Sequence, residues 1–496
     1  MTARRLAPLP GSGTEPAEVT FTFDGRPFRA PEGEPLAVAM LAADQPILSR
    51  SFRFHRPRGL MCDTGQCGWC ECEVDGRPSV RSCQVPVRDG LVARSEHAWP
   101  SVDRDLFGWL DLGSRWIPPT FYHHRFLRPR PLQKRYLDVI RGFGGRGRLR
   151  PAAGSAAVPR GRAVRELETE VLVVGGGRSG IGAADQAAGD GSSVVLLEAV
   201  PGRARPTRPD VRVLDGATAV GWYEGVLTAV DRDALWSIRA RSVIAATGSY
   251  ERMPTVRGAD RPGVMGARRA LDLVTHHRVL PGERPLLVGD GAELAEVADA
   301  FAAAGARVVG RVATASLRRV LGRRRVTGAI VEIDGRSRRE SVDVIVIGDR
   351  VPNLDLVLAA GAEVRDAGGV LVPVLDESGR TSVPLLSVVG SATGQTSAAV
   401  PEALQVPAGR ALVCFCEDVH ADEIRAQLAA GYSDPELVKR RTGALTGPCQ
   451  GKYCLQAFAT TVAGAGTSLP SLPTARPPLR PVRLGDLVPG TDAREP

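Results

Sequence analysis

Nine cysteines fall into two spaced groups, and each group could hold a metal cluster. The first group has the spacing Cys-x4-Cys-x2-Cys-x12-Cys, and the second has Cys-x-Cys-x32-Cys-x4-Cys. Thiolates bind soft metals, and four of them can ligate two irons that are bridged by sulfides. The sequence therefore predicts two [2Fe–2S] clusters. The predicted ligands are Cys62, Cys67, Cys70 and Cys83 for the first cluster, and Cys414, Cys416, Cys449 and Cys454 for the second.

Zinc is the alternative metal for both groups. Gly65 and Gly68 would let the first loop approach a cluster closely and donate N–H groups to its sulfurs. Structural zinc sites more often show paired Cys-x2-Cys knuckles, so the first spacing favours iron. The short Cys-x-Cys spacing of the second group also suits zinc, which stays the stronger alternative there. Cys72, two residues after Cys70, is expected to be a buried apolar side chain and not a ligand.

A glycine-rich dinucleotide fingerprint lies between the two cysteine groups. Its glycines follow an apolar run and precede a helical pattern, so they would make a tight turn and bring pyrophosphate to a helix N-terminus. An acid at the end of the next apolar run can accept hydrogen bonds from ribose hydroxyls. Two later loops would also reach the nucleotide, and a turn with no ligand is the alternative. The predicted binding residues are Gly175, Gly177, Gly180, Glu198, Thr247, Gly248, Gly390 and Gly394.

A second unit of the same kind begins at Leu286 and contains Gly289-Asp290-Gly291. Leu294 replaces the third glycine, and Arg311 stands where a ribose-binding acid is expected. These changes disfavour NAD and leave three readings open: a vestigial site, a phosphorylated ligand, or no ligand. No Cys-x-x-Cys pair lies between residues 170 and 400, which disfavours disulfide reduction. No residue of the sequence is assigned a catalytic role.

The elements that position these residues must form several domains, because 496 residues with 43% hydrophobic content exceed one core. The net charge of +9 comes from arginine, and the densest run, Arg318 to Arg325, has no interleaved aromatic residues to stack on bases. Nucleic-acid binding is therefore not expected. No apolar run is long enough to span a membrane, and the N-terminus lacks the apolar core of a signal peptide. These features predict a cytoplasmic protein whose thiols stay reduced.

Local patterns predict the main elements. Alternation around Asp24-Gly25 predicts a hairpin, and Glu71 to Val74 predicts a strand. Each glycine-rich motif lies in a strand–helix–strand pattern, with the second unit's last strand expected at Arg307 to Val309. A helix is expected near Ala421 to Ala430. Residues from about Trp99 to Val164 show no clean period.

The chain resembles the alpha subunit of heteromeric sarcosine oxidases over about residues 19 to 480. It lacks the folate-binding aminomethyltransferase region that follows in those proteins, and looks closer to the related hydrogen cyanide synthases, hydroxyproline and dye-linked proline dehydrogenases, and opine oxidases. The motifs that carry the resemblance are Phe52-Arg53-Phe54-His55-Arg56-Pro57-Arg58-Gly59, Ala246-Thr247-Gly248-Ser249-Tyr250-Glu251-Arg252, Pro262-Gly263-Val264-Met265, Glu417-Asp418-Val419 and Glu436-Leu437-Val438-Lys439-Arg440.

The resemblance implies an α/β multidomain fold. It would contain an N-terminal β-grasp ferredoxin-like [2Fe–2S] domain, a flavoprotein core of two Rossmann-like dinucleotide-binding domains, and a small helical C-terminal domain like bacterioferritin-associated ferredoxin (BFD-like), also with a [2Fe–2S] cluster. The expected parts are a disordered arm (1–18), the ferredoxin-like domain (19–105), a connector (106–168), a shortened FAD-binding domain (169–280 and 346–400), a second nucleotide-binding-like domain (281–345), the BFD-like domain (401–468) and a Pro-rich tail (469–496).

The resemblance implies that this chain serves in electron transfer. The catalytic beta subunit, of the D-amino-acid-oxidase superfamily, would oxidise an amine or amino acid. This chain would then relay the electrons through FAD and two [2Fe–2S] clusters to a quinone or carrier, and a second nucleotide or FMN could stand at a subunit interface. Two other readings stay open: a stand-alone NAD(P)H-dependent reductase, and a non-catalytic redox scaffold or sensor.

Overall fold

The computed structural model describes residues 3–7, 16–113, 116–121, 128–144, 161–394, 406–407, 409–464 and 472–490. The chain forms two compact units, each built from three separate segments. The first unit comprises Met1–Gly154, Glu251–Asp349 and Leu404–Pro470. The second comprises Ser155–Tyr250, Arg350–Ala403 and Ser471–Pro496. Both cysteine groups thus belong to the first unit, and the glycine fingerprint belongs to the second.

The first unit begins with a five-stranded sheet in the order β3-β2-β8-β6-β7, packed against helix α1 as in a β-grasp fold. Its elements are β2 (Glu18–Phe23), β3 (Arg26–Pro31), α1 (Leu36–Ala42), β6 (Glu71–Val74), β7 (Arg77–Arg81) and β8 (Val92–Ser95). The predicted hairpin and the predicted strand at Glu71 are both present. Short strand β4 (Ser49–Arg50) precedes the first motif of the resemblance and pairs with β5 (Pro57–Arg58), which lies near the end of that motif.

The expectation of a disordered N-terminal arm is wrong for residues 3–7. Strand β1 (Arg4–Arg5) pairs with β17 (Val279–Leu280), and Leu6 is buried. The Arg5 guanidinium donates two hydrogen bonds to Glu34, at 2.9 and 2.8 Å. These contacts come from residues distant in sequence, so no local pattern could reveal them. The remainder of the arm, residues 1–2 and 8–15, lies outside the described residues.

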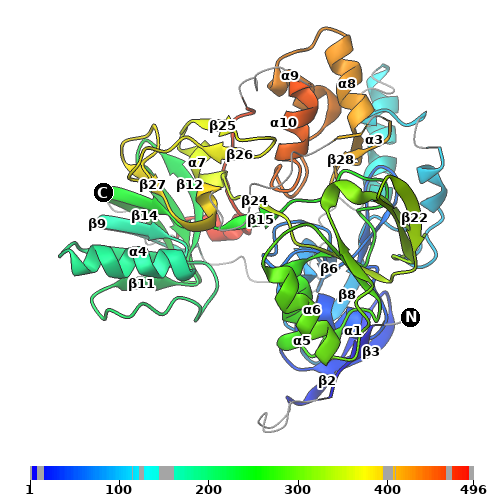
Figure 1. The fold of residues 1–496 in the computed structure, drawn as a ribbon, viewed down its shortest axis with the longest axis horizontal. Coiled ribbons are helices and arrows are strands. Elements are labelled where there is room, and N and C mark those ends of the chain that lie inside the picture. The colour runs from blue at the N-terminus through cyan, green and yellow to red at the C-terminus, as the bar shows by residue number, and fades with distance from the viewer. Residues whose placement is uncertain are drawn as a thin grey trace. The chain divides into compact units, whose positions relative to one another are not determined.

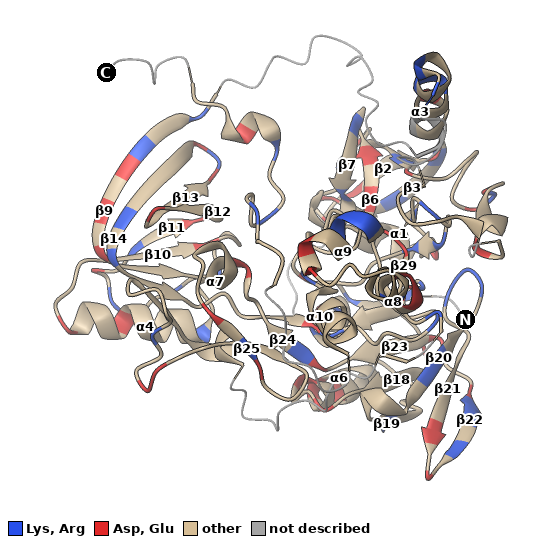
Figure 2. Ribbon diagram, turned by 90° about the horizontal axis from the view of Figure 1, so that it is seen from above, with Lys and Arg blue, Asp and Glu red and all other residues tan. Residues whose placement is uncertain are grey.

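The middle segment of the first unit contains a four-stranded parallel sheet, in the order β16-β23-β18-β19. Its elements are β16 (Val264–Gly266), α5 (Ala267–Thr275), β18 (Pro285–Val288), α6 (Glu293–Ala303), β19 (Gly310–Val312) and β23 (Val344–Ile347). The strand expected at Arg307 to Val309 thus lies at Gly310–Val312 instead. An antiparallel sheet of β20 (Leu317–Leu321), β21 (Gly328–Ile333) and β22 (Arg336–Glu340) is inserted before β23, and arginines mark β20 and β22 (Figure 2). Residues 251–280, expected in the FAD-binding domain, cluster with this unit.

The last segment of the first unit is a small, mostly helical domain. It contains β28 (Leu412–Cys414), β29 (Val419–His420), α8 (Ala421–Ala429), α9 (Pro435–Thr442) and α10 (Leu455–Ala463). The expected helix near Ala421 is therefore present. Asp434 caps α9 by accepting a hydrogen bond from the Leu437 amide, and Gly443 ends that helix with φ +74°.

The second unit is built on one seven-stranded sheet (Figure 1). Its order is β11-β10-β9-β14-β13-β12, with β27 also paired to β14, and helix α4 packs on β9 and β10. The bounds are β9 (Ala163–Val174), α4 (Arg178–Gly189), β10 (Val194–Glu198), β11 (Arg212–Asp215), β12 (Thr218–Tyr223), β13 (Val226–Val230), β14 (Ala234–Ala245) and β27 (Leu386–Val388). β10, β9, β14 and β27 run parallel, so their carboxyl ends lie along the same side of the sheet.

Helix α3 (Arg130–Gly144) was not expected, because the connector showed no clean period. Its apolar residues Leu132, Tyr136, Val139 and Ile140 recur at helical spacing between arginines. Tyr136, Val139 and Ile140 line an aromatic cavity together with residues of the preceding segment. Among the described residues, no helix is both long and apolar enough to cross a membrane.

Candidate functional site

The four cysteines of the first group are buried in the loop after β5 and in the turn after β7. Their thiols stand in two hydrogen-bonded pairs, Cys62 with Cys67 and Cys70 with Cys83. The bond from Cys67 lowers the pKa of Cys62 to about 5, and burial raises the pKa of Cys67. Two thiol pairs fit a [2Fe–2S] cluster, in which each iron takes two sulfurs from the protein. Within the described part of the chain, no three His, Cys, Asp or Glu side chains are grouped to hold a single metal ion.

Cys72 stands apart from these pairs. It lies on β6, is fully buried in the core of the β-grasp domain, and burial raises the pKa of its thiol. This environment supports the expectation that Cys72 is a core side chain.

The second cysteine group is equally buried and forms a chain of thiol contacts. Cys416 and Cys454 both hydrogen-bond Cys449, and Cys454 also contacts Cys414. A side chain at Gly447 would collide with the Cβ of Cys416, so glycine lets the two ligand loops approach each other. Four thiols from a hairpin and a helix N-terminus can therefore serve one cluster.

The two cysteine loops touch each other directly. The Sγ of Cys416 lies 3.7 Å from the carbonyl oxygen of Cys67, and the rings of Trp69 and Phe415 are 5.5 Å apart. An added Cβ at Gly68 would come within 2.8 Å of the Cγ of Pro448. Two groups that are hundreds of residues apart in sequence therefore form one continuous site.

The arginine-rich stretch before the first cysteine loop ties the three segments of the unit together. Arg58 donates to Asp260, to the Oδ1 of Asp418 at 2.8 Å and to the carbonyl of Phe415 at 2.9 Å. The other carboxylate oxygen of Asp418 accepts from the Phe54 amide at 3.1 Å. Burial alone would raise the pKa of Asp260, but Arg58 and Arg56 overcome it and lower that pKa to about 2.

These carboxylates were not singled out from the sequence. Asp418 is completely buried and Asp260 is 4% exposed. Each forms an ion pair with Arg58, which belongs to another segment of the chain. The only available signal was that both the arginine stretch and Asp418 lay in the motifs of the resemblance.

In the second unit, the glycine fingerprint forms a tight turn between β9 and α4. Gly175 has φ +113°, and a side chain at Gly180 would collide with its carbonyl oxygen. By contrast, an added Cβ at Gly177 would meet no atom within 4 Å. The turn is thus closely packed on two sides and open at the position where a pyrophosphate would approach. Glu198 accepts hydrogen bonds from the amides of Gly176 and Val200, both at 2.7 Å.

The two later loops also lie against this turn. A side chain at Gly175 would collide with the carbonyl of Ala246, which precedes Thr247 and Gly248. A side chain at Gly390 would come within 2.5 Å of the Ser179 Oγ, at the start of α4. Thr247 is held by Asn353 through bonds of 3.1 and 3.2 Å. Gly394 has φ +78° and packs against Val372. The loop of Thr247 and the loop of Gly390 therefore lie against the fingerprint turn, whereas Gly394 packs against Val372 at the end of the second of these loops.

The second glycine-rich turn, in the first unit, is hydrogen-bonded to a carboxylate of the chain, that of Asp349. The Oδ1 of Asp349 accepts a hydrogen bond from the Asp290 amide at 2.8 Å, and a side chain at Gly289 would collide with that carboxylate. Arg252 and Thr314 hold the other oxygen at 2.6 and 2.7 Å. Asp349 thus binds one backbone amide of this turn, as Glu198 binds the amide of Gly176 in the first turn.

Comparison with known proteins agrees with this organisation. Residues 16–98 match the 2Fe-2S iron-sulfur cluster binding domain family, and residues 408–491 match the sarcosine oxidase A3 domain family. The chain is 28% identical to the alpha subunit of sarcosine oxidase from Rhizobium meliloti (strain 1021), over 95% of this chain and 57% of that protein. It is 25% identical to one subunit of the opine oxidase from the same strain, over 64% of this chain and 98% of that protein.

A solved structure, the L-proline dehydrogenase from P. horikoshii, shares the fold over 96% of this chain and 98% of its own, with a TM-score of 0.70 and 22% identity. The chain is a homologue of the sarcosine oxidase alpha subunit and spans 57% of its length, which confirms the resemblance found in the sequence. The expected fold class is also confirmed: an N-terminal 2Fe-2S domain, a Rossmann-like flavoprotein fold and a C-terminal domain of the sarcosine oxidase type.

Proposed function

We propose that this chain is the electron-transfer alpha subunit of a heteromeric flavin and iron–sulfur dehydrogenase or oxidase that acts on the CH–NH bond of an amine or amino acid. Its named relatives include subunits of sarcosine oxidase and opine oxidase. A partner flavoprotein of the D-amino-acid-oxidase type would hold the substrate site. This chain would relay the electrons to a quinone or a carrier.

The observation that carries the proposal is the direct contact between the two cysteine loops. Electron transfer slows steeply with distance, so carriers that exchange electrons must lie close together. The Sγ of Cys416 lies 3.7 Å from the Cys67 carbonyl oxygen, so the loops that would carry the two ligand sets are in direct contact. A scaffold with two independent zinc sites would not require this proximity.

The residues that would hold the cofactors follow from the geometry. The thiol pairs Cys62–Cys67 and Cys70–Cys83 would bind one [2Fe–2S] cluster, and the four cysteines of the second group would bind another. When bound, such clusters supply one-electron carriers whose potentials depend on burial and on hydrogen bonds to the sulfurs. In the second unit, the open position at Gly177 would admit the pyrophosphate of FAD, and Glu198 would face its ribose.

The first test is the content of iron, acid-labile sulfide and flavin per chain, in protein purified without oxygen. The proposal expects about four irons, about four sulfides and one flavin per chain. The extracted flavin, FAD or FMN, tells whether the fingerprint or an interface site holds it. Zinc in place of iron at either cysteine group would contradict the relay. A flavoprotein that co-purifies from the native host would identify the partner subunit.

The NAD(P)H-dependent reductase is the second candidate, and one observation weighs against it. Arg311 stands where a ribose-binding acid is expected, and it donates to the Gly289 carbonyl at 3.0 Å across the second glycine-rich turn. Addition of NADH or NADPH alone under argon should therefore leave the flavin absorbance unchanged. Bleaching of the flavin within seconds would favour the reductase instead.

A further inference from the structure

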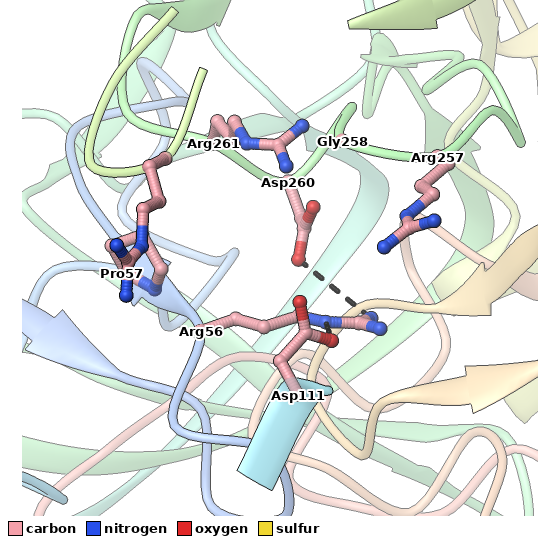
Figure 3. Close-up of a pocket in the computed structure, with 8 residues that line it drawn as sticks. Arg56, Pro57, Asp111, Arg257, Gly258, Asp260 and Arg261 are labelled. Atoms are coloured by element: carbon pink, nitrogen blue, oxygen red, sulfur yellow. Dashed lines mark hydrogen bonds and ion pairs between the residues drawn. The ribbon is translucent and has the colours of Figure 1, made fainter. Parts of the chain in front are cut away.

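A small cavity lined by arginines lies in the first unit, beside the arginine-rich stretch that precedes the first cysteine loop. Its volume is about 40 Å³, and it is bounded by the stretch before the first cysteine loop, a 3-10 turn, the turn before β16 and the turn after β20 (Figure 3). The lining residues are Arg56, Pro57, Asp111, Arg257, Gly258, Asp260, Arg261 and Arg323.

The charges around this cavity do not balance. Four of its lining residues are arginines and two are aspartates, so the wall carries two unmatched positive charges. Arg56 is paired with Asp111 at 2.8 Å and lies within 4.0 Å of Asp260. Both carboxylates are therefore already engaged. The neighbouring ion pair of Arg58 and Asp418 adds one positive and one negative charge, so the excess of two positive charges stays the same.

Two of the guanidinium groups have no partner among the described residues. The Arg257 carbonyl accepts a hydrogen bond from the Val320 amide, but the guanidinium groups of Arg257 and Arg323 form no hydrogen bond or ion pair with any residue that the structure describes. Arg257 extends toward the gap beside Arg56 and Asp260 (Figure 3). Free surface arginines are common, but two that border one cavity already lined by other arginines repel one another unless an anion lies between them.

The backbone of the cavity is shaped to hold one of these arginines in place. Gly258 has φ +89°, and a side chain there would collide with the Arg261 guanidinium and the Val320 carbonyl. Arg261 donates to that carbonyl at 2.6 Å and so lies across the turn. Burial lowers the pKa of Arg261, and the like charges of Arg257 and Arg56 add to that effect, against the pull of Asp260.

We propose that this cavity binds a phosphate group, either as inorganic phosphate or as the terminal phosphate of a monoester. A phosphate monoester carries about −1.5 to −2 charges near neutral pH, which matches the surplus of the wall. A cavity of about 40 Å³ accommodates a few water-sized groups, so a single tetrahedral oxyanion is the size that it admits. Guanidinium groups donate several parallel hydrogen bonds to such oxygens.

A carboxylate from an acidic partner protein fits less well. A carboxylate brings one charge and binds arginine in one plane, whereas the arginines here come from three separate turns around the cavity. The inference is independent of the electron relay, because none of the lining residues is a predicted cofactor ligand.

The test is a calorimetric titration of the full-length protein at constant ionic strength. Inorganic phosphate is expected to bind saturably at one site, and sulfate is expected to compete with it, while acetate is not. The double variant Arg257→Ala/Arg323→Ala should bind phosphate at least about tenfold more weakly, since it loses two charge-assisted contacts. The matched control is Arg338→Ala/Arg339→Ala, which removes the same charge from exposed positions of β22.

Adenosine 5′-monophosphate distinguishes the two sources of phosphate. Tighter binding of the monoester than of phosphate would assign the cavity to the end of a larger ligand, and the reverse order would assign it to the free ion. Equal phosphate affinity in the two double variants would overturn the inference. So would binding of a polyglutamate peptide but not of phosphate. The iron content of each variant, unchanged from that of the parent, shows that the fold and the relay are intact.

Discussion

At the scale of single residues, buried ion pairs decide how the first unit holds together. Arg58 is 3% exposed and faces Asp260 and Asp418, neither of which is more than 4% exposed. Removing one partner of such a pair leaves an uncompensated buried charge and costs about 3–5 kcal/mol. These side chains are far from solvent, so added salt would screen them little.

The lowered pKa of Asp260 predicts a loss of stability in acid. Its pKa falls from 3.8 to about 2 in the folded protein, so its charge stabilises the fold above the unfolded value. That contribution, about 2.5 kcal/mol, is lost as the pH falls from about 4 to 2. Burial alone would raise the pKa of Glu423, but His420 and Arg53 lower it to about 2. Its contribution to stability is therefore lost over a similar range of pH. Urea unfolding at a series of pH values measures the slope.

The control for this prediction is Asp260→Asn. The variant should be less stable at pH 7 and should show a flatter dependence on pH between about 4 and 2, because the amide does not titrate. An unchanged slope would show that Asp260 does not contribute to acid unfolding.

The cysteines give a second prediction at this scale. Cys72→Ala removes only a core sulfur, so we expect unchanged iron and a cost of about 1 kcal/mol. Cys70→Ala removes one of the paired thiols and should lower the iron content by about two per chain. Iron analysis with urea unfolding checks both. Loss of iron in the Cys72 variant would make that residue a ligand.

At the scale of elements, two glycines of the turn between β9 and α4 are expected to have different roles, one in packing and one in nucleotide binding. A side chain at Gly180 collides with the Gly175 carbonyl, whereas one at Gly177 meets open space. Gly180→Ala should therefore destabilise the second unit. Gly177→Ala should leave the melting temperature of flavin-free protein nearly unchanged and reduce flavin content several-fold. Equal flavin content in the Gly177 variant and the parent would show that no dinucleotide binds at this turn.

Elements with a local signal were predictable from the sequence, and those without one were not. The hairpin at Asp24-Gly25 and the strand at Glu71 follow from turn chemistry and alternation within a few residues. Helix α3 was missed because its short apolar pattern lies within a long Arg- and Pro-rich stretch that shows no clean period as a whole. Strand β1 was missed because its order depends on β17 and on Glu34, which are distant in sequence.

The same distinction holds for the candidate site. Cysteine and glycine spacing is a local signal, so both cysteine groups and the fingerprint could be identified from the sequence. The contact between the two cysteine loops and the pairing of Arg58 with Asp418 join residues more than 340 positions apart. Such contacts depend on the packing of three segments, and no single-sequence pattern encodes it.

At the scale of the whole molecule, the contact between the cysteine loops predicts magnetic coupling between the two proposed clusters. The cysteine loops touch, so two reduced paramagnetic centres would lie close enough to broaden or split each other's electron paramagnetic resonance signals. We expect this interaction in the fully reduced protein. Cys454→Ser, which disrupts the second ligand set, should restore a simple signal from the first cluster. Independent signals in the parent protein would contradict the close packing.

The assembly of this unit from separated segments also constrains its biosynthesis. Arg58 and Asp418 are 360 positions apart, and a ribosome that adds 5–20 residues per second needs roughly 20–70 s to make that stretch. During this time the nascent first cysteine loop lacks Phe415, Pro448 and the carboxylate that binds Arg58. Its burial is therefore complete only after the last helix has left the exit tunnel. A proposed cluster that needs the completed site would therefore be inserted after translation, and until then the open loop would leave its cysteines accessible to oxygen and to competing metals.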